Sequence, residues 1–261
     1  MPVITAHHCL TKYQQIGSAK KTILLLHGWR NDWQSWSFLV PHLSGDFSVL
    51  IPDLPGFGQS ESPQKGWTTK DYILWLEEFL ETVGITQLEA VIGHSYGAKV
   101  AAYGWLTHSH LPPIVHGLFL VGPSGIPNRL PFFKKILKTG LSLIPKSIKR
   151  GILGKWRTGF YSLIDNDADY LHSTAFQEQT LQHILSEDIR KLIKKPSSVP
   201  LHLFWGENDT ASPLWMAYEW LKTSTPSEVF VVPQGTHFAH QEFSDLFRLW
   251  LLAWSKRGRQ S

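Results

Sequence analysis

The sequence predicts an α/β fold, with a mostly parallel twisted sheet and helices on both of its faces. Short apolar segments with the length of buried strands alternate with longer segments of helical periodicity. The chain has 261 residues, which is enough for one large domain with a substantial core. A helical stretch without a convincing strand interrupts the alternation at residues 124–198, before the last two strands.

The first half of the chain contains four predicted strands, at residues 22–26, 47–51, 90–92 and 117–121. Each is a short apolar run, and Gly or Pro follows closely, as expected where a buried strand enters a loop. Three helices are predicted between them, at residues 33–43, 69–83 and 96–106. The segment 69–83 shows the clearest helical spacing, because its apolar residues recur on one face and Gly84 follows.

After the interruption, strands are predicted at 200–205 and 228–232, and helices at 213–222 and 241–254. Ligands of open α/β sheets bind at the carboxyl edge of the strands. We therefore interpret the insert as a helical cap over that edge. The chain is then divided into an α/β core of residues 1–123 and 199–261 and a cap of residues 124–198.

Composition narrows the class of protein. The one cysteine, Cys9, excludes an internal disulfide, and it lies outside every motif, so an inert thiol is expected. No apolar run is long enough for a bilayer span, and the start of the chain lacks the pattern of a signal peptide. A cytoplasmic protein is predicted, with no nucleic-acid partner.

The net charge of +4 is unevenly distributed. Residues 129–164 of the predicted cap hold nine of the 25 Lys and Arg residues and no Asp or Glu. Two interpretations stay open. In one, these residues include an ordinary cap helix with a solvated lysine face, and in the other they make a weak contact with an anionic membrane surface or an acidic substrate.

The motif with the strongest chemical meaning is Gly93-His94-Ser95-Tyr96-Gly97, between a predicted strand and a predicted helix. A serine nucleophile must project from the scaffold, and a sharp strand-to-helix turn achieves this. Gly93 and Gly97 would relieve the crowding in such a turn. Ser95 is the candidate nucleophile.

A serine hydroxyl needs a base, and the base needs a partner that fixes its tautomer. His237, in a loop after the last predicted strand, is the preferred base, and His240 is its rival. Asp209, after the preceding strand, is the preferred acid, and Glu207 competes with it. The chain order Ser95, Asp209, His237 is the order that α/β enzymes with such a turn use.

An acyl-transfer site also needs two backbone N–H donors for the oxyanion. The motif His27-Gly28-Trp29 follows the first predicted strand, so the Trp29 N–H is one candidate and the Tyr96 N–H is the other. Gly28 would permit close approach of the backbone. No spacing typical of a metal site or of a phosphate-binding loop is present, so neither a metal nor a cofactor is predicted.

Taken together, these motifs resemble the α/β-hydrolase superfamily, in its branch of serine hydrolases with a helical cap. The resemblance extends from about Thr22 to Trp254 and rests on five segments in the family's order: residues 26–29, 53–60, 93–97, 205–209 and 235–237. It implies Ser95 as nucleophile, His237 as base, Asp209 as acid, and the Trp29 and Tyr96 N–H groups as oxyanion donors, with His27, Gly28, Gly93, His94 and Gly97 as supporting motif residues. It also implies that residues 53–60 form a structural turn, so Asp53 is not a catalytic candidate.

The expected activity is hydrolysis of carboxylic esters of small or medium-sized molecules through an acyl-enzyme. Amides, thioesters and ketone-activated carbon–carbon bonds remain alternatives on the same scaffold. Epoxide hydrolases and haloalkane dehalogenases of this superfamily use an aspartate nucleophile, and Ser95 argues against both. The alternative of another class is a non-catalytic or slow-turnover receptor for a small molecule. The oligomeric state stays open.

Overall fold

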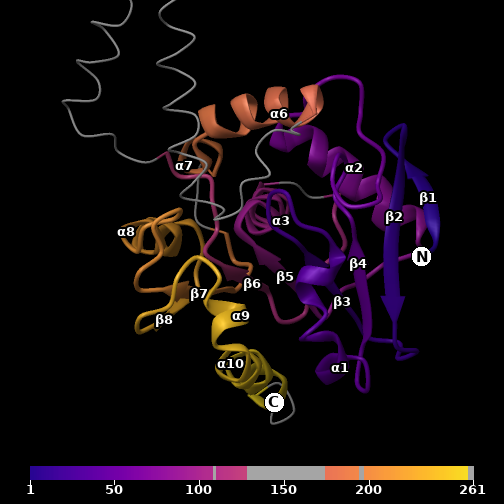
Figure 1. The fold of residues 1–261 in the computed structure, drawn as a ribbon. Coiled ribbons are helices and arrows are strands. Elements are labelled where there is room, and N and C mark those ends of the chain that lie inside the picture. The colour runs from indigo at the N-terminus through magenta and orange to yellow at the C-terminus, as the bar shows by residue number, and fades with distance from the viewer. Residues whose placement is uncertain (108–109, 128–173, 194–196, 258–261) are drawn as a thin grey trace, which may run out of the picture. The chain divides into compact units, whose positions relative to one another are not determined.

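The computed structural model describes residues 1–107, 110–127, 174–193 and 197–257. These residues contain an eight-stranded sheet with the strand order β1-β2-β4-β3-β5-β6-β7-β8 (Figure 1). All pairs from β4 to β8 are parallel, and only the pairs of β2 with β1 and with β4 are antiparallel. The predicted fold class, a mostly parallel sheet flanked by helices, is confirmed.

The hairpin of β1 (Val3–Ala6) and β2 (Cys9–Ile16) was not predicted from the sequence. His7 and His8 form its two-residue turn, and both have positive φ, 48° and 58°. Such turns are usually recognised by Asn and Gly, which adopt positive φ most readily. Because His7 and His8 are not typical turn residues, nothing in the sequence indicated a hairpin here.

The other six strands agree with the predicted ones to within two residues. They are β3 (Thr22–Leu26), β4 (Ser48–Pro52), β5 (Ala90–His94), β6 (Leu118–Val121), β7 (Leu201–Gly206) and β8 (Ser227–Val232). Every residue of β3, β4, β5 and β6 is buried. Burial on both faces of a central sheet explains why these strands read as continuous apolar runs rather than as alternating patterns.

The predicted helices at 69–83 and 96–106 are α2 (Thr69–Thr82) and α3 (Ser95–Thr107). The start of α2 is a capping box, in which Thr68 and Asp71 each accept a hydrogen bond from the other's backbone N–H. The capping box fixes the point where the loop after β4 becomes a helix, at the same edge of the sheet as the candidate site.

Each of the other predicted helices corresponds to two elements in the structure. Residues 33–43 form the 3₁₀ helix η1 (Trp33–Trp36) and the short α1 (Val40–Leu43). Pro41 is compatible with the first turn of α1 but lacks the N–H that one continuous helix would need. The later segments are α8 (Trp215–Trp220) followed by η3 (Leu221–Thr223), and α9 (Ala239–Glu242) followed by α10 (Ser244–Arg257).

Most of the predicted cap lies outside the described residues, and so does its basic stretch at 129–164. The described part contains α6 (Ala175–Ser186) and α7 (Ile189–Leu192). By its contacts, the chain divides into one compact unit of residues 1–126 and 175–261 and a second unit of residues 127–174. The helices α6 and α7 thus belong to the same unit as the sheet.

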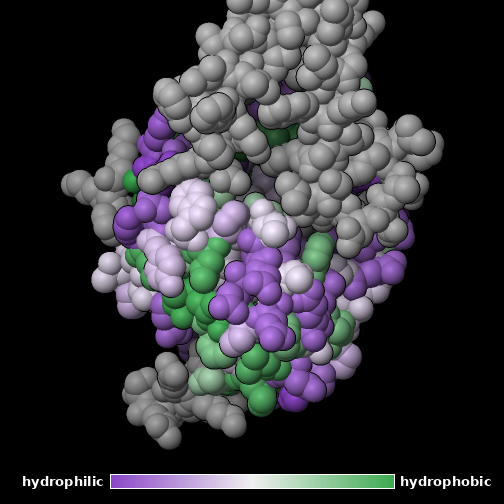
Figure 2. Space-filling model, turned by 60° about the vertical axis from the view of Figure 1, so that its left-hand side comes forward, coloured by the Kyte–Doolittle hydropathy of each residue, from purple (hydrophilic) through white to green (hydrophobic). Residues whose placement is uncertain are grey.

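No helix in the described part of the chain combines the length and the apolar character that a membrane crossing requires. On the face shown in Figure 2, hydrophobic areas of the described surface are interrupted by hydrophilic ones. The large apolar side chains that are exposed come from separate elements, among them Leu10 of β2, Leu185 of α6, Tyr218 of α8 and Leu249 of α10.

Candidate active site

Ser95 directly follows β5 and is the first residue of α3. Its φ is 51°, in the left-handed region that residues with a side chain seldom adopt and that is frequent at functional sites. The two flanking glycines make this turn sterically feasible. A Cβ on Gly93 would lie 2.6 Å from the Ala98 Cα, and a Cβ on Gly97 would lie 2.4 Å from the His27 carbonyl oxygen.

The loops after β7 and β8 bring Asp209 and His237 together. The His237 Nδ1 donates to the Asp209 Oδ2 over 2.8 Å, and both side chains are buried. The Asp209 Oδ1 accepts a second hydrogen bond from the Ser212 backbone N–H at 2.7 Å. Both carboxylate oxygens are therefore fixed, and with the proton on Nδ1 the His237 Nε2 is left as the acceptor.

Gly122, at the end of β6, has a place in this site that the sequence did not reveal. A Cβ on it would lie 2.9 Å from the Asp209 Oδ2 and 3.2 Å from the His237 Nδ1, and its φ is 46°. The space needed by the hydrogen bond between Asp209 and His237 thus depends on a glycine in a neighbouring loop. The sequence signal for this role was a glycine directly after β6, the strand that lies between β5, which Ser95 follows, and β7, which Asp209 follows.

His94 connects the turn of Ser95 to the loop of His237. Its Nε2 donates to the His237 carbonyl oxygen at 3.1 Å, and the centroids of the two rings are 4.9 Å apart. The Ser95 hydroxyl makes no hydrogen bond with another described residue. The three candidate residues share the carboxyl edge of the sheet, after β5, β7 and β8.

The rivals of His237 and Asp209 have different surroundings. His240 is fully buried against Trp36, His94 and Phe247, and neither of its ring nitrogens has a hydrogen-bond partner among the described residues. Burial, with a smaller effect of the nearby His237, lowers the pKa of His240 to about 3. Glu207 is exposed, and its Oε2 accepts a hydrogen bond from the Gln234 backbone N–H at 3.1 Å.

The predicted oxyanion donors follow two neighbouring strands, Trp29 after β3 and Tyr96 after β5. The Tyr96 N–H is in the first turn of α3, where helical N–H groups have no intrahelical acceptor. The Trp29 ring lies 5.6 Å from the Tyr96 ring and 4.8 Å from the Phe57 ring, measured between centroids. Neither N–H donates to an acceptor within the described part of the chain.

The supporting motif has clear structural roles. The His27 Nε2 accepts from the Leu54 backbone N–H at 2.9 Å, and burial lowers the pKa of this ring to about 4. Gly28 is required because a Cβ there would lie 2.8 Å from the His94 Nδ1. These contacts hold the loop of Trp29 against both the turn of Ser95 and the loop after β4.

Two further groups are occupied by structural contacts. Asp53 accepts hydrogen bonds from the backbone N–H groups of Trp33 and Gln59, at 2.8 and 2.9 Å. The Cys9 Sγ donates to the Glu61 carbonyl oxygen at 3.2 Å, and burial raises the pKa of this thiol to about 12. Within the described ranges, no group of three or more His, Cys, Asp or Glu side chains has a geometry suited to a metal ion.

The fold and this arrangement define a class of protein, and residues 23–248 match the model of the alpha/beta hydrolase family. The chain belongs to that family. A soluble epoxide hydrolase of Corynebacterium sp. is 37% identical to it over 81 residues, which are 31% of this chain and only 28% of that relative's length. The Karrikin insensitive 2 receptor CA of Petunia hybrida is 28% identical over 224 residues, covering 76% of this chain and 78% of the receptor.

Solved structures share the fold over almost the whole chain. A bacterial membrane phospholipase A matches with a TM-score of 0.74 and 20% identity, over 100% of this chain and 86% of that one. An esterase from Exiguobacterium antarcticum matches with a TM-score of 0.73 and 17% identity, over 97% and 98% of the two chains. The α/β-hydrolase fold predicted from the sequence is thereby confirmed.

Proposed function

We propose that this α/β-hydrolase is a serine hydrolase that cleaves carboxylic esters of small or medium-sized molecules through an acyl-enzyme. The observation that carries the proposal is the buried hydrogen bond between His237 and Asp209 at the sheet edge where Ser95 begins α3. A histidine that is held in one tautomer by a carboxylate is the group that a serine nucleophile requires. The esterase among the similar structures is consistent with this assignment.

In the proposed reaction, the Ser95 Oγ attacks the ester carbonyl while the His237 Nε2 takes the hydroxyl proton. Asp209 stabilises the imidazolium that forms, and the Trp29 and Tyr96 N–H groups stabilise the oxyanion. The C–O bond to the alcohol breaks as His237 returns the proton to the leaving oxygen. Water, deprotonated by His237, then attacks the acyl-enzyme, and Ser95 regains its proton as the carboxylic acid leaves. The protein supplies every group used, so no cofactor is needed.

Epoxide opening is disfavoured as the reaction, although an epoxide hydrolase is among the relatives. A carboxylate that opens an epoxide forms an ester, whose carbonyl water can attack. A serine oxygen would form an ether, which has no carbonyl and would block the enzyme. With Ser95 at the turn after β5, an epoxide is expected to inactivate the protein rather than to turn over.

Labelling with a fluorophosphonate probe tests the activated serine. The wild-type protein is expected to label, and Ser95→Ala and His237→Leu are expected not to. A folded wild-type protein that does not label has no activated serine, and this result would reject the proposal. Turnover of p-nitrophenyl esters of increasing acyl length, beside matched amides and thioesters, then identifies the bond that is cleaved.

A receptor is the second candidate, because one relative is named as a receptor and matches most of this chain. Such a protein can keep a reactive serine yet turn over slowly. The discriminating result is a burst of p-nitrophenol equal to the protein concentration with almost no steady-state release. Sustained turnover favours the hydrolase.

A further inference from the structure

A group of polar contacts joins three helix ends beside the candidate site. We call it the helix junction and define it as Thr69, Lys99, Ile184 and Glu187. Lys99 lies on α3, one turn after Ser95, and its side chain is only 1% exposed. None of the four residues has a part in the proposed reaction.

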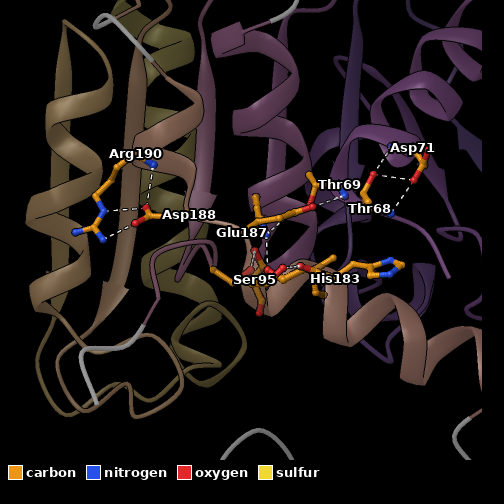
Figure 3. A network of polar contacts seen from close by, with 12 residues as sticks. Thr68, Thr69, Asp71, Ser95, His183, Glu187, Asp188 and Arg190 are labelled. Carbon is orange, nitrogen blue, oxygen red and sulfur yellow. Dashed lines mark hydrogen bonds and ion pairs between the residues drawn. The ribbon is translucent and has the colours of Figure 1, made fainter. Parts of the chain in front are cut away.

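The charged groups of Lys99 and Glu187 bind to each other and to backbone groups at helix ends. The Lys99 Nζ donates to the Ile184 carbonyl oxygen at 2.8 Å and to the Glu187 Oε2 at 2.6 Å. Ile184 is in the last turn of α6, where carbonyl groups lack intrahelical partners and favour a cation. The Glu187 carboxylate accepts from the Thr69 backbone N–H at 2.9 Å and from the Thr69 hydroxyl, at the amino end of α2, which favours an anion. Figure 3 shows Glu187 directed toward Thr69.

Lys99 occupies an unfavourable position by itself. Burial lowers its pKa despite the opposing effect of Glu187, and a cation near the amino end of α3 opposes the dipole of that helix. Buried ion pairs contribute little net stability compared with apolar residues of similar size. A role in placing elements relative to one another therefore explains the pair better than a role in stability.

The elements that the junction places are those around Ser95. Residues 175–193, which we call the returning arm, lead from the insert back to the sheet. The Ile189 N–H of this arm donates to the Gly125 carbonyl oxygen at 2.9 Å, and the neighbouring Ser124 N–H donates to the Ser95 carbonyl oxygen at 3.2 Å. Lys99 packs against Gly125, where a Cβ would lie 3.1 Å from the lysine Cγ and Cδ.

The returning arm also covers the loop between β4 and α2. The Gln177 side chain donates to the Gly56 carbonyl oxygen, and the Thr180 hydroxyl accepts from the Trp67 N–H, both at 2.9 Å. Phe57 of this loop contacts the ring of Trp29, beside a proposed oxyanion donor. A shift of the returning arm would therefore change the surroundings of Ser95 in two places, at Ser124 and in the loop between β4 and α2.

We propose that Lys99 and Glu187 are positioning residues that hold the returning arm against the start of α3 and so determine how well larger acyl groups are bound. This inference rests on the proposed serine hydrolase function. A small acyl group needs only the turn of Ser95, whereas a longer one extends to walls farther away, and their placement governs its binding.

The test compares wild type with Lys99→Met/Glu187→Met, an apolar pair that should preserve the fold, and with Glu187→Gln, which keeps the shape of the acid. Lys21→Met is the control, because Lys21 is an exposed lysine whose ion pair with Glu89, 3.4 Å long, includes no residue of the junction or of the returning arm. In the double variant and in Glu187→Gln, the KM for p-nitrophenyl octanoate is expected to rise on the order of tenfold, while the KM for p-nitrophenyl acetate stays unchanged. The control should change neither value.

A double variant that melts like wild type and has an unchanged KM for both esters would overturn the proposal. If the double variant does not fold, Glu187→Gln decides by the same criterion. Amide hydrogen exchange gives a readout without catalysis. Exchange at residues 184–193 should quicken in the junction variants and stay constant in α10, and unchanged exchange would reject the positioning role. An unlabelled wild-type protein would instead reject the proposed function, so the two failures are distinguishable.

Discussion

At the scale of single residues, the first prediction concerns the candidate nucleophile, Ser95. Ser95→Ala should lose on the order of 10⁶ in kcat on an ester that the wild type cleaves, because the acyl-enzyme cannot form. The melting temperature should not fall, since the Ser95 hydroxyl has no hydrogen bond to another described residue. Substantial turnover by a purified, folded Ser95→Ala protein would contradict the assignment.

The second prediction concerns His237 and His240, which lie three residues apart but have different surroundings. His237→Leu should abolish turnover, since of the two histidines His237 is the one bonded to Asp209. His240→Leu should retain turnover and melt at an equal or higher temperature, because an unpaired buried polar group costs about 1–3 kcal/mol. Asp209→Asn should lose on the order of 10⁴ in kcat. An active His237→Leu beside an inactive His240→Leu would reverse the base assignment.

At the scale of elements, the turn between β5 and α3 depends on close contact with the end of β3. Gly97→Ala would place a Cβ 2.4 Å from the His27 carbonyl oxygen, so α3 would have to move away from the sheet. We expect a large loss of thermal stability and loss of probe labelling. Gly45→Ala is the control, because a Cβ there meets no atom within 4 Å. Equal melting temperatures for the two variants would show that the turn is not sterically constrained.

At the scale of the whole molecule, three buried histidines link stability to pH. Burial lowers the pKa of His27 from the usual 6.5 to about 4 and that of His240 to about 3, and it lowers that of His94 as well. Below pH 6.5 the unfolded chain therefore binds protons that the folded chain does not, and stability falls as the pH falls toward the folded values. The urea midpoint should drop steadily between pH 7 and pH 5.

His240→Leu isolates one contribution to this dependence. Removing one buried histidine should reduce the slope of unfolding free energy by up to about 1.4 kcal/mol per pH unit in that range. Burial raises the pKa of Asp53, so at lower pH this residue increases the unfolding free energy as the pH falls. Its effect is the same in wild type and in His240→Leu. Identical slopes for wild type and His240→Leu would contradict the lowered pKa of His240 in the folded protein.

The sequence by itself determined the central strands, the turn of Ser95 and the order in which the candidate residues occur. These features depend on apolar runs, on glycine spacing and on flanking residues, all of which lie within short windows. The N-terminal hairpin was missed because His7 and His8 give no typical turn signal, and the helix predicted at 33–43 is divided because Pro41 favours a new start.

Only the tertiary structure decided which side chains meet. It joined His237 rather than His240 to Asp209, gave Gly122 its place beside that pair, and brought Lys99 to Glu187 across 88 positions of sequence. Such partnerships depend on how strands and helices pack, because a loop residue can turn toward or away from the sheet edge without any change in local pattern. The sequence thus predicted the type of chemistry, and packing selected the residues that could perform it.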